Sequence, residues 1–274
     1  MGALHVVATP IGNLEDVTLR ALRVLGEAAL LLAEDTRRTR TLLERHGIEA
    51  RPVSLHAHNE AQRSALALEV LGRGQDVALV SDAGTPLVSD PGERLVAAAL
   101  EAGHAVVPVP GASALLAALV GSGLPAARFH FAGFPPRRAG ERDKLFAALA
   151  ARPETLLFFE SPRRLADTLA ALAGALGPRR ACVARELSKL HEEFVRGTLP
   201  ELAERFADGA RGEVTLVVAG APARSAAATD EVLEAAIRAR SAAGGSPSDI
   251  ARDVARATGL ARKAVYARVL ESST

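Results

Sequence analysis

The amino-acid sequence predicts an α/β protein made of two α/β domains followed by a small helical extension. Over residues 1–120, short apolar runs alternate with segments of helical periodicity. Over residues 121–220 strands outnumber helices, and a stretch of small and polar residues at 221–229 precedes a helical pattern at 230–274. With 274 residues, 49% of them hydrophobic, the chain is long enough to bury a core in each of two domains.

The first predicted domain, residues 1–120, has the pattern of a parallel sheet covered by helices on both faces. Its apolar runs are nearly continuous, which is typical of strands buried on both sides. We expect strands at Leu4–Ala8, Ala28–Ala33, Pro52–Leu55, Val77–Ser81 and Ala105–Val109. We expect helices between them at Asp16–Leu25, Thr36–Arg45, Glu60–Leu71 and Glu93–Ala102.

The second predicted domain, residues 121–220, has fewer helices between its strands. We expect strands at Phe129–Ala132, Thr155–Phe159, Ala181–Ala184, Glu193–Gly197 and Val214–Ala219. We expect helices at Ala139–Ala151, Pro162–Leu176 and Pro200–Ala207. Because no helix separates the third strand from the fourth, Val195–Gly197 is better read as part of a hairpin, and the sheet as mixed.

The extension at 230–274 has the spacing of a helix-turn-helix. Ser246 can cap a helix that has Pro247 at its first position and Asp249 three residues on. Gly259 then breaks the pattern, and a further helix carries Leu260, Val265, Val269 and Leu270 inward with Arg262, Lys263 and Arg268 outward. Residues 229–274 hold seven basic and six acidic side chains. Nucleic-acid contact and a plain packing or dimer module therefore both remain open.

The bulk composition points to no particular partner. The formal net charge is +1, and all but three of the 33 basic residues are arginine. Codon usage explains this most simply, although arginine also binds phosphate bidentately and stacks on bases. No apolar run is long enough to span a membrane, and the first residues lack a signal-peptide pattern, so we expect a cytoplasmic protein. The single cysteine, Cys182, excludes an internal disulfide and is expected to be buried.

Two loops at the ends of predicted strands are candidates for a ligand site. Residues 81–92, directly after Val77–Val80, hold two Asp, two Gly and two Pro, more than a turn requires. Gly84 permits close approach of a backbone, and the prolines make the loop rigid. The next strand ends in a loop of small residues at 110–114. Ligands of parallel sheets bind beyond these strand ends, so we expect a polar ligand here, although tight connections would also explain each loop. No glycine-rich dinucleotide or phosphate loop occurs.

Six motifs in order carry a resemblance to a known family. They are Thr9-Pro10-Ile11-Gly12-Asn13-Leu14, Ala33-Glu34-Asp35-Thr36-Arg37, Leu79-Val80-Ser81-Asp82-Ala83-Gly84-Thr85-Pro86, Pro110-Gly111, Phe159-Glu160-Ser161 and Ala184-Arg185-Glu186-Leu187. Together they resemble the tetrapyrrole-methylase superfamily, and within it the bacterial branch that methylates the 2′-hydroxyl of a cytidine ribose in 16S ribosomal RNA. The resemblance covers residues 4–220, and the C-terminal helices resemble that branch's helix-turn-helix extension.

The resemblance implies a fold, a cofactor and partners. The fold is two α/β domains of the tetrapyrrole-methylase type with a cleft between them, which binds S-adenosylmethionine. The implied partners are 16S rRNA in the small ribosomal subunit and a second copy of the chain, as a homodimer. The residues that match cofactor-binding positions are Pro10, Ser81, Asp82, Ala83, Gly84, Val88, Ser113, Ala114, Glu160, Leu187 and Thr215. One departure favours the ribosomal branch: the Gly-Asp-Pro loop of tetrapyrrole-methylating relatives reads Asp82-Ala83-Gly84-Thr85-Pro86 here.

The chemistry that such an enzyme needs suggests further candidates. S-adenosylmethionine carries an activated methyl group, so no metal is required, and no metal-ligand cluster is evident. His56 and His58 could be metal ligands but are better read as polar groups near the site. A ribose hydroxyl must lose its proton, and the candidate catalytic residues are Asp35, Glu186 and Lys189, which follow apolar strands.

Basic residues in loops and helix starts are candidates for RNA contact. They are Arg37, Arg137, Arg138, Arg163, Arg164, Arg262 and Lys263. Aromatic residues make up only 3% of the chain, so a broad base-stacking platform is not expected. Two other functions remain open: a methyltransferase of precorrin-type tetrapyrroles, and a DNA-binding regulator whose α/β part senses a ligand.

Overall fold

The structure is a computed structural model that describes residues 2–222, 226–242, 244–258 and 262–272. The chain forms two compact units, Met1–Ala221 and Pro222–Thr274. The first unit contains two five-stranded sheets, and the second is helical. The predicted fold class, α/β followed by a helical extension, is confirmed.

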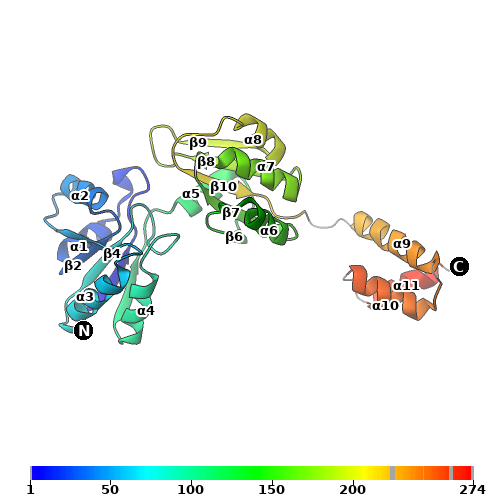
Figure 1. The fold of residues 1–274 in the computed structure, drawn as a ribbon, viewed down its shortest axis with the longest axis horizontal. Coiled ribbons are helices and arrows are strands. Elements are labelled where there is room, and N and C mark those ends of the chain that lie inside the picture. Colours follow the sequence, from blue (N-terminus) through cyan, green and yellow to red (C-terminus); the bar gives the residue numbers. More distant parts are fainter. Residues whose placement is uncertain (1, 223–225, 243, 259–261, 273–274) are drawn as a thin grey trace. The chain divides into compact units, whose positions relative to one another are not determined.

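The first sheet, in which Figure 1 labels β2 and β4, is entirely parallel and has the strand order β3-β2-β4-β1-β5. Its strands are β1 (Ala3–Val7), β2 (Leu30–Ala33), β3 (Pro52–Ser54), β4 (Val77–Val80) and β5 (Ala105–Val109). Its helices are α1 (Leu19–Glu27), α2 (Thr36–Arg45), α3 (Glu60–Gly72) and α4 (Glu93–Glu101), with a short 3₁₀ turn at Leu14–Asp16. Because all strands run the same way, the loops after them meet at one edge of the sheet.

Alternating side chains of the first sheet enter two separate cores. In β4, Ala78 and Val80 pack in one core with residues of α1 and α2. Val77 and Leu79 pack in the other with residues of α3 and α4. All four side chains are at most 1% exposed. Helices thus cover both faces of the sheet, as its nearly continuous apolar strands predict.

The second sheet is mixed, with strand order β6-β7-β10-β8-β9. Its strands are β6 (Phe129–Phe131), β7 (Thr155–Glu160), β8 (Arg180–Arg185), β9 (Glu193–Thr198) and β10 (Val214–Val218). Only β6 and β7 are parallel, and β8 and β9 form the predicted antiparallel hairpin. The last strand in sequence, β10, lies in the centre, paired with both β7 and β8.

Helices also cover both faces of the second sheet. One face packs against α6 (Ala139–Leu149), α7 (Leu165–Leu176) and α8 (Leu199–Arg205). The other face packs against α5 (Ala114–Ser122), the helix that follows the last strand of the first sheet. Cys182 lies on this second face and is fully buried, as predicted, and burial raises the pKa of its thiol to about 11.

Several element boundaries differ from the prediction, and the starts of β2, α1 and α7 are examples. Ala28 does not begin β2, because it ends α1 in an extended conformation and its N–H bonds the Val24 carbonyl. Helix α1 begins at Leu19, since the Thr18 side chain accepts the Ala21 N–H at 3.1 Å and so caps it there. Helix α7 begins at Leu165, three residues after Pro162.

The second unit contains α9 (Ala226–Ala242), α10 (Pro247–Thr258) and α11 (Arg262–Glu271). Helix α9 begins inside the range 221–229 that we predicted as a linker. The predicted cap of α10 is confirmed, because Ser246 Oγ accepts the Asp249 N–H at 3.2 Å. Val265 and Val269 are buried as predicted, whereas Leu270 is 46% exposed. The predicted break at Gly259 and the side chain of Leu260 lie outside the described residues.

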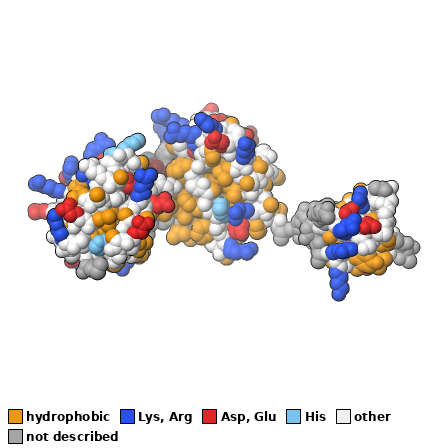
Figure 2. Space-filling model, turned by 60° about the horizontal axis from the view of Figure 1, so that its bottom comes forward, with side chains coloured by type: hydrophobic (Ala, Val, Ile, Leu, Met, Phe, Trp, Pro, Cys, Tyr) orange, Lys and Arg blue, Asp and Glu red, His pale blue; other side chains and the backbone are white. Residues whose placement is uncertain are grey.

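The surface carries no strong separation of charge on the face drawn in Figure 2, where basic and acidic side chains of the described residues are interspersed. This pattern agrees with the formal net charge of +1. In the described part of the chain, no helix combines the length and the apolar character that crossing a membrane requires.

Candidate functional site

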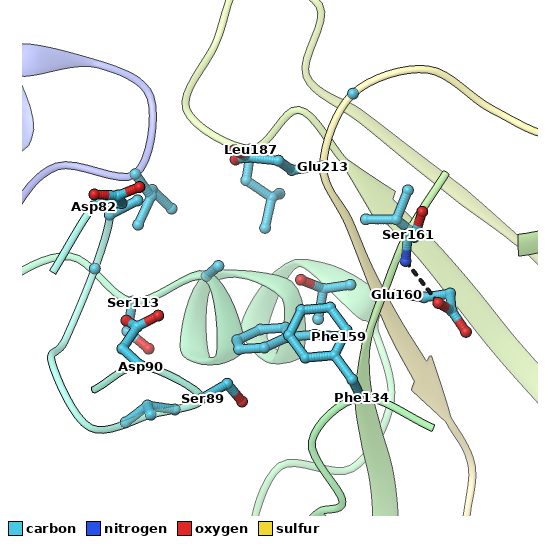
Figure 3. A pocket seen from close by; sticks show the side chains of 18 of the residues that line it. Asp82, Ser89, Asp90, Ser113, Phe134, Phe159, Glu160, Ser161, Leu187 and Glu213 are labelled. Atoms are coloured by element: carbon cyan, nitrogen blue, oxygen red, sulfur yellow. Dashed lines mark hydrogen bonds between the residues drawn. The ribbon is translucent and has the colours of Figure 1, made fainter. Parts of the chain in front are cut away.

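Two pockets adjoin each other where loops of the first sheet face those of the second. The larger, of about 370 Å³, is called the apolar pocket below (Figure 3). Predicted cofactor residues that line it are Asp82, Ala83, Gly84, Val88, Ser113, Ala114, Glu160, Leu187 and Thr215. Its other lining residues are Ile11, Arg38, Thr85, Ser89, Asp90, Phe134, Phe159, Ser161, Pro162, Gly212, Glu213 and Val214.

The smaller pocket, of about 320 Å³, is called the polar pocket below. It is lined by Thr9, Pro10, Ile11, Gly12, Leu14, Arg38, Thr39, Thr41, Leu42, Ser81, Asp82, Ala83, Lys189 and Glu213. Pro10 and Ser81, which we predicted at the cofactor, line this pocket and not the apolar one. The two pockets share five residues, Ile11, Arg38, Asp82, Ala83 and Glu213.

The loop at 81–92 is held in shape by the rest of the first sheet's edge. Gly84 exchanges two backbone hydrogen bonds with Thr9, of 2.8 and 2.9 Å. Its φ of +80° and a built Cβ only 3.3 Å from Ile11 explain why glycine stands there. At the other end, the buried Glu60 carboxylate accepts the N–H groups of Gly92 and Arg94 at 3.2 and 3.0 Å. The loop at 81–92 therefore forms one wall of the apolar pocket, held by the protein's own hydrogen bonds.

Aromatic side chains form the opposite wall of the apolar pocket. Phe134, after β6, lies with its ring centroid 5.5 Å from that of Phe159 in β7. Phe159 in turn meets Phe131 edge-on at 4.9 Å. Phe134 is 54% exposed, so its face is available to a flat ligand. Phe159 belongs to one of the six motifs, but neither phenylalanine was predicted to line the site.

Three carboxylates gather beside the apolar pocket, on loops that follow β2 and β4. Burial, together with the negative charges of Glu34 and Asp82, raises the pKa of Asp90 to about 6, although a hydrogen bond from Ser81 opposes this shift. Burial also raises the pKa of Glu34, although the hydrogen bond from the Asp82 N–H opposes this effect. The group repels added negative charge and favours a cationic ligand.

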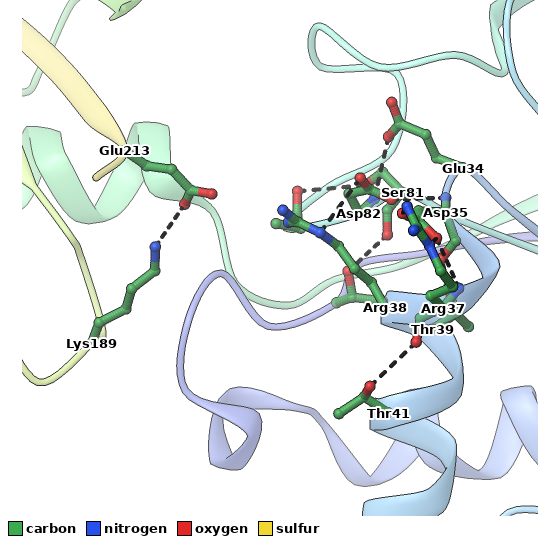
Figure 4. A network of polar contacts seen from close by, with 12 residues as sticks. Glu34, Asp35, Arg37, Arg38, Thr39, Thr41, Ser81, Asp82, Lys189 and Glu213 are labelled. Carbon is green, nitrogen blue, oxygen red and sulfur yellow. Dashed lines mark hydrogen bonds and ion pairs between the residues drawn. The ribbon is translucent and has the colours of Figure 1, made fainter. Parts of the chain in front are cut away.

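Asp35 occupies a structural position. It is the N-cap of α2, accepting the Arg37 N–H at 2.9 Å, and its carboxylate also binds the Arg37 guanidinium at 3.0 and 2.7 Å (Figure 4). Hydrogen bonds from Arg37 lower the pKa of Asp35 to about 2, so this carboxylate is a poor proton acceptor. Arg37 is tied to it and lines neither pocket. The next residue, Arg38, lines both, and its Nε lies 3.8 Å from the Asp82 carboxylate.

Lys189 and Glu186 lie in the loop after β8, but only Lys189 reaches the polar pocket. Its Nζ lies 2.8 Å from Glu186 Oε1 and 3.2 Å from Glu213 Oε2. Burial lowers the pKa of Lys189, but the two carboxylates outweigh burial and the net shift is upward. The hydrogen bond from Lys189 lowers the pKa of Glu186. Lys189 is thus a fixed positive charge facing Arg38 and Asp82 across the pocket (Figure 4).

The predicted RNA-contacting arginines of the first unit separate into exposed side chains and a partly buried one. Arg137 and Arg163 are exposed beside the apolar pocket's rim residues Phe134 and Pro162, and Arg138 is exposed with a 3.3 Å contact to Glu141. Arg164, in contrast, binds the buried carboxylate of Glu160 and the Pro135 carbonyl. The structure therefore does not support the RNA contact predicted for Arg164, because this arginine neutralises a buried charge.

The remaining candidates are not among the residues that line the two pockets. In the second unit, Arg262 and Lys263 are exposed on α11, and Arg262 donates to Ser248 Oγ at 2.9 Å. His56 and His58 are exposed after β3, with ring centroids 5.9 Å apart. Within the described residues, no three His, Cys, Asp or Glu side chains are placed to hold a metal ion.

Sequence reasoning missed Asp90, Arg38, Glu213 and Phe134 as pocket residues. Asp90 lies in the loop at 81–92 that the sequence analysis names, and Arg38 directly follows the Ala33–Arg37 motif, but the sequence did not show that their side chains point into a pocket. Glu213 directly precedes β10, and because β10 runs antiparallel to β8 its start lies beside the end of β8. Only the strand order reveals this proximity.

Comparison with known proteins agrees with this architecture. A sequence profile of the tetrapyrrole (corrin/porphyrin) methylases matches residues 3–203. The ribosomal RNA small subunit methyltransferase I of Micromonospora olivasterospora is 49% identical over 271 residues, covering 98% of this chain and 86% of that protein. The protein of the same name from Mesorhizobium japonicum is 49% identical over 273 residues, covering 98% of this chain and 92% of that protein.

A solved structure supports the fold. The uroporphyrin-III-C-methyltransferase of Thermus thermophilus aligns with a TM-score of 0.57 and 24% identity, covering 80% of this chain and 94% of that one. This likeness concerns the fold alone. The profile match and the two close relatives together show that the chain belongs to the tetrapyrrole (corrin/porphyrin) methylase family.

Proposed function

We propose that this protein transfers a methyl group from S-adenosylmethionine to the 2′-hydroxyl of a cytidine ribose in 16S ribosomal RNA. The names of relatives 49% identical to nearly the whole chain support an rRNA substrate in the small ribosomal subunit. The observation that carries the proposal is the pair of adjoining pockets, which share five residues. One pocket suits a methyl donor and the other a ribose-phosphate acceptor, so the reacting groups would meet at the shared wall.

The apolar pocket fits S-adenosylmethionine in size and chemistry. Its volume of about 370 Å³ lies within the range of small-molecule sites. Phe134 and Phe159 provide an apolar wall for an adenine ring, and Ser113 and the backbone of residues 82–85 provide polar groups. Asp82 and Asp90 favour the cationic part of this ligand. When bound, the cofactor supplies a methyl group that its sulfonium already activates.

The polar pocket suits the acceptor because two cations face each other across it. Arg38 and Lys189 can hold a phosphate beside the target ribose and stabilise negative charge on its 2′-oxygen. Thr39 and Thr41 also line this pocket, and because their hydroxyl groups donate to the Asp35 and Arg37 carbonyls, their oxygens can accept a hydrogen bond from a ribose hydroxyl. Lys189 remains protonated at neutral pH, since its pKa is raised, so its role is electrostatic.

We assign the proton acceptor to Glu213. This carboxylate lines both pockets, and its Oε2 lies 3.2 Å from Lys189 Nζ, so the lysine would orient it. Asp35 is tied to Arg37, and Glu186 lines neither pocket. In the proposal, Asp35 therefore caps α2 and Glu186 holds Lys189 in place, and neither accepts the proton.

RNA contacts outside the pockets are assigned to exposed arginines. Arg137, Arg138 and Arg163 lie near the rim of the apolar pocket and would contact phosphates on either side of the target. Arg262 and Lys263 on α11 would add contacts from the second unit. The cytoplasmic location expected from the sequence and the homodimer implied by the resemblance belong to this proposal too.

Mapping of 16S rRNA by mass spectrometry tests the proposal. RNA from a deletion strain should lack one ribose methyl group, and the wild-type gene should restore it. A Lys189→Met gene should fail to restore it while its product still binds S-adenosylmethionine in calorimetry. An unchanged map in the deletion strain would refute the rRNA assignment. Methylation of a tetrapyrrole in place of RNA would favour the precorrin-type alternative.

A further inference from the structure

The loop after β8 places three successive side chains in three different environments. Leu187 is 7% exposed and lines the apolar pocket. Lys189 lines the polar pocket. Between them, the Ser188 hydroxyl donates to Asp16 Oδ2 and accepts the Asn13 N–H at 3.2 Å. Asn13 and Asp16 belong to the loop after β1, so Ser188 joins the second sheet's loop to the first sheet's.

The loop is rigid within itself. Ser188 N–H donates to Glu192 Oε2 at 2.7 Å, and Lys189 N–H donates to the Glu186 carbonyl at 3.0 Å. Glu186 and Ser188 have φ values of +51° and +66°, a conformation that non-glycine residues adopt only when their surroundings hold them in it. A loop of this kind moves as one body, so a contact at Ser188 sets the position of its neighbours on both sides.

The two loops also pack closely on each other. A Cβ built on Gly12 would lie 2.5 Å from Lys189 Cγ and 2.9 Å from the Leu187 carbonyl oxygen. Only glycine leaves room for this approach. Ile11 and Leu187 belong to the same buried cluster. The loop after β1 therefore fits directly against the segment that carries Leu187 and Lys189.

We propose that Ser188 and Asp16 are positioning residues, which fix Lys189 in the polar pocket relative to the donor in the apolar pocket. This inference rests on the proposed function, because it assigns the two pockets to donor and acceptor. Neither side chain need touch a reacting atom. Their contact sets the distance between the positive charge of Lys189 and the shared wall of the pockets, and alignment errors of about 1 Å can cost up to about 100-fold in rate.

A double-mutant cycle tests the assignment. We expect Ser188→Ala and Asp16→Ala each to slow single-turnover methyl transfer to the small subunit about tenfold at saturating S-adenosylmethionine. The double variant should be no slower than the slower single variant, since both remove one contact. The affinity for S-adenosylmethionine should change less than about threefold, because most of the apolar pocket is intact. Glu15→Ala, which removes an exposed neighbouring carboxylate, is the matched control and should behave as wild type.

A wild-type rate in the single variants, or independent losses that multiply in the double variant, would overturn the assignment. Amide hydrogen exchange of the protein without substrate provides a second readout. We expect residues 186–192 to exchange faster in Ser188→Ala than in Glu15→Ala, and equal exchange would also overturn it. If the wild-type protein transfers no methyl group to RNA, the proposed function fails, whereas the exchange measurement still decides whether Ser188 holds this loop.

Discussion

The guanidinium of Arg164 lies against the carboxylate of Glu160 in a two-pronged ion pair, with Nε–Oε1 and Nη2–Oε2 distances of 2.9 Å each. The Glu160 side chain is 0% exposed, and it also accepts the Ser161 N–H and the Thr168 hydroxyl. A buried carboxylate loses its hydration, and these hydrogen bonds and the ion pair replace the lost water contacts. This pair fixes the end of β7 where it lines the apolar pocket.

Arg164→Ala should destabilise the protein because it leaves the Glu160 charge buried without a counter-ion. We expect the free energy of unfolding to fall by about 3 kcal/mol. Urea denaturation of the full chain at pH 7 measures this change. Arg163→Ala, on the exposed neighbour, is the control and should alter it by no more than about 0.5 kcal/mol. Equal effects would show that the pair contributes nothing particular to folding.

Asp82→Ala and Arg137→Ala should separate donor binding from RNA binding. The Asp82 carboxylate lines both pockets and accepts the Asp35 N–H at 2.8 Å, so its loss should weaken S-adenosylmethionine binding about tenfold. Arg137 lies outside both pockets, and its loss should weaken RNA binding alone. Calorimetry with the donor and filter binding with 16S rRNA measure the two affinities. If both variants lose both affinities equally, the assignment of Asp82 to donor binding and of Arg137 to RNA binding is wrong.

Asp90 should make stability depend on pH. Its pKa of about 6 exceeds the ordinary value of 3.8, so the folded state binds this proton more tightly than the unfolded chain does. The resulting stabilisation is complete below pH 3.8 and is lost as pH rises through 6. Asp90→Asn should therefore stabilise the protein at pH 8, by on the order of 1 kcal/mol after allowance for solvent screening.

Urea denaturation at pH 4 and pH 8 checks this sign. The advantage of Asp90→Asn should shrink at pH 4, where the wild-type carboxyl group is largely protonated. Glu101→Gln, an exposed change in α4, provides the control and should show no such pH-dependent gain. A larger advantage at pH 4 than at pH 8 would contradict the raised pKa.

Two glycine-to-alanine changes in helices should have opposite effects. A Cβ on Gly121 in α5 would lie 2.3 Å from the Phe194 ring, so Gly121→Ala should cost about 1–3 kcal/mol of stability. A Cβ on Gly174 in α7 would meet nothing within 4 Å, so Gly174→Ala should stabilise by about 0.5–1 kcal/mol. Thermal unfolding of both variants tests the contrast. Stabilisation by Gly121→Ala would mean that α5 packs less tightly on β9 than described.

The pocket-forming loops could be predicted because their residue types are unusual for simple turns. The loop at 81–92 combines prolines and glycines directly after a buried strand, and it proved to be a wall of the apolar pocket. The parallel first sheet and the β8–β9 hairpin also followed from the pattern of apolar runs. In these cases local chemistry and chain order determine the outcome.

The direction and pairing of single side chains could not be predicted in the same way. Arg37 and Arg38 look equivalent in sequence. Because α2 begins at Thr36, the two side chains leave the helix in different directions, and only Arg38 lines the pockets. Arg164 looked like a surface cation until the burial of Glu160 was known, although their spacing of four residues permitted a pair. Such roles depend on tertiary packing.

The central position of β10 in the second sheet has a consequence for synthesis of the protein. Strands β7 and β8 are both complete by Arg185, yet the strand that joins them begins only at Val214. During synthesis, β6–β7 and β8–β9 therefore form two separate strand pairs, each with an unpaired edge, until β10 leaves the ribosome. A chain that stops before Val214 should expose these edges and aggregate, however well its first sheet has folded.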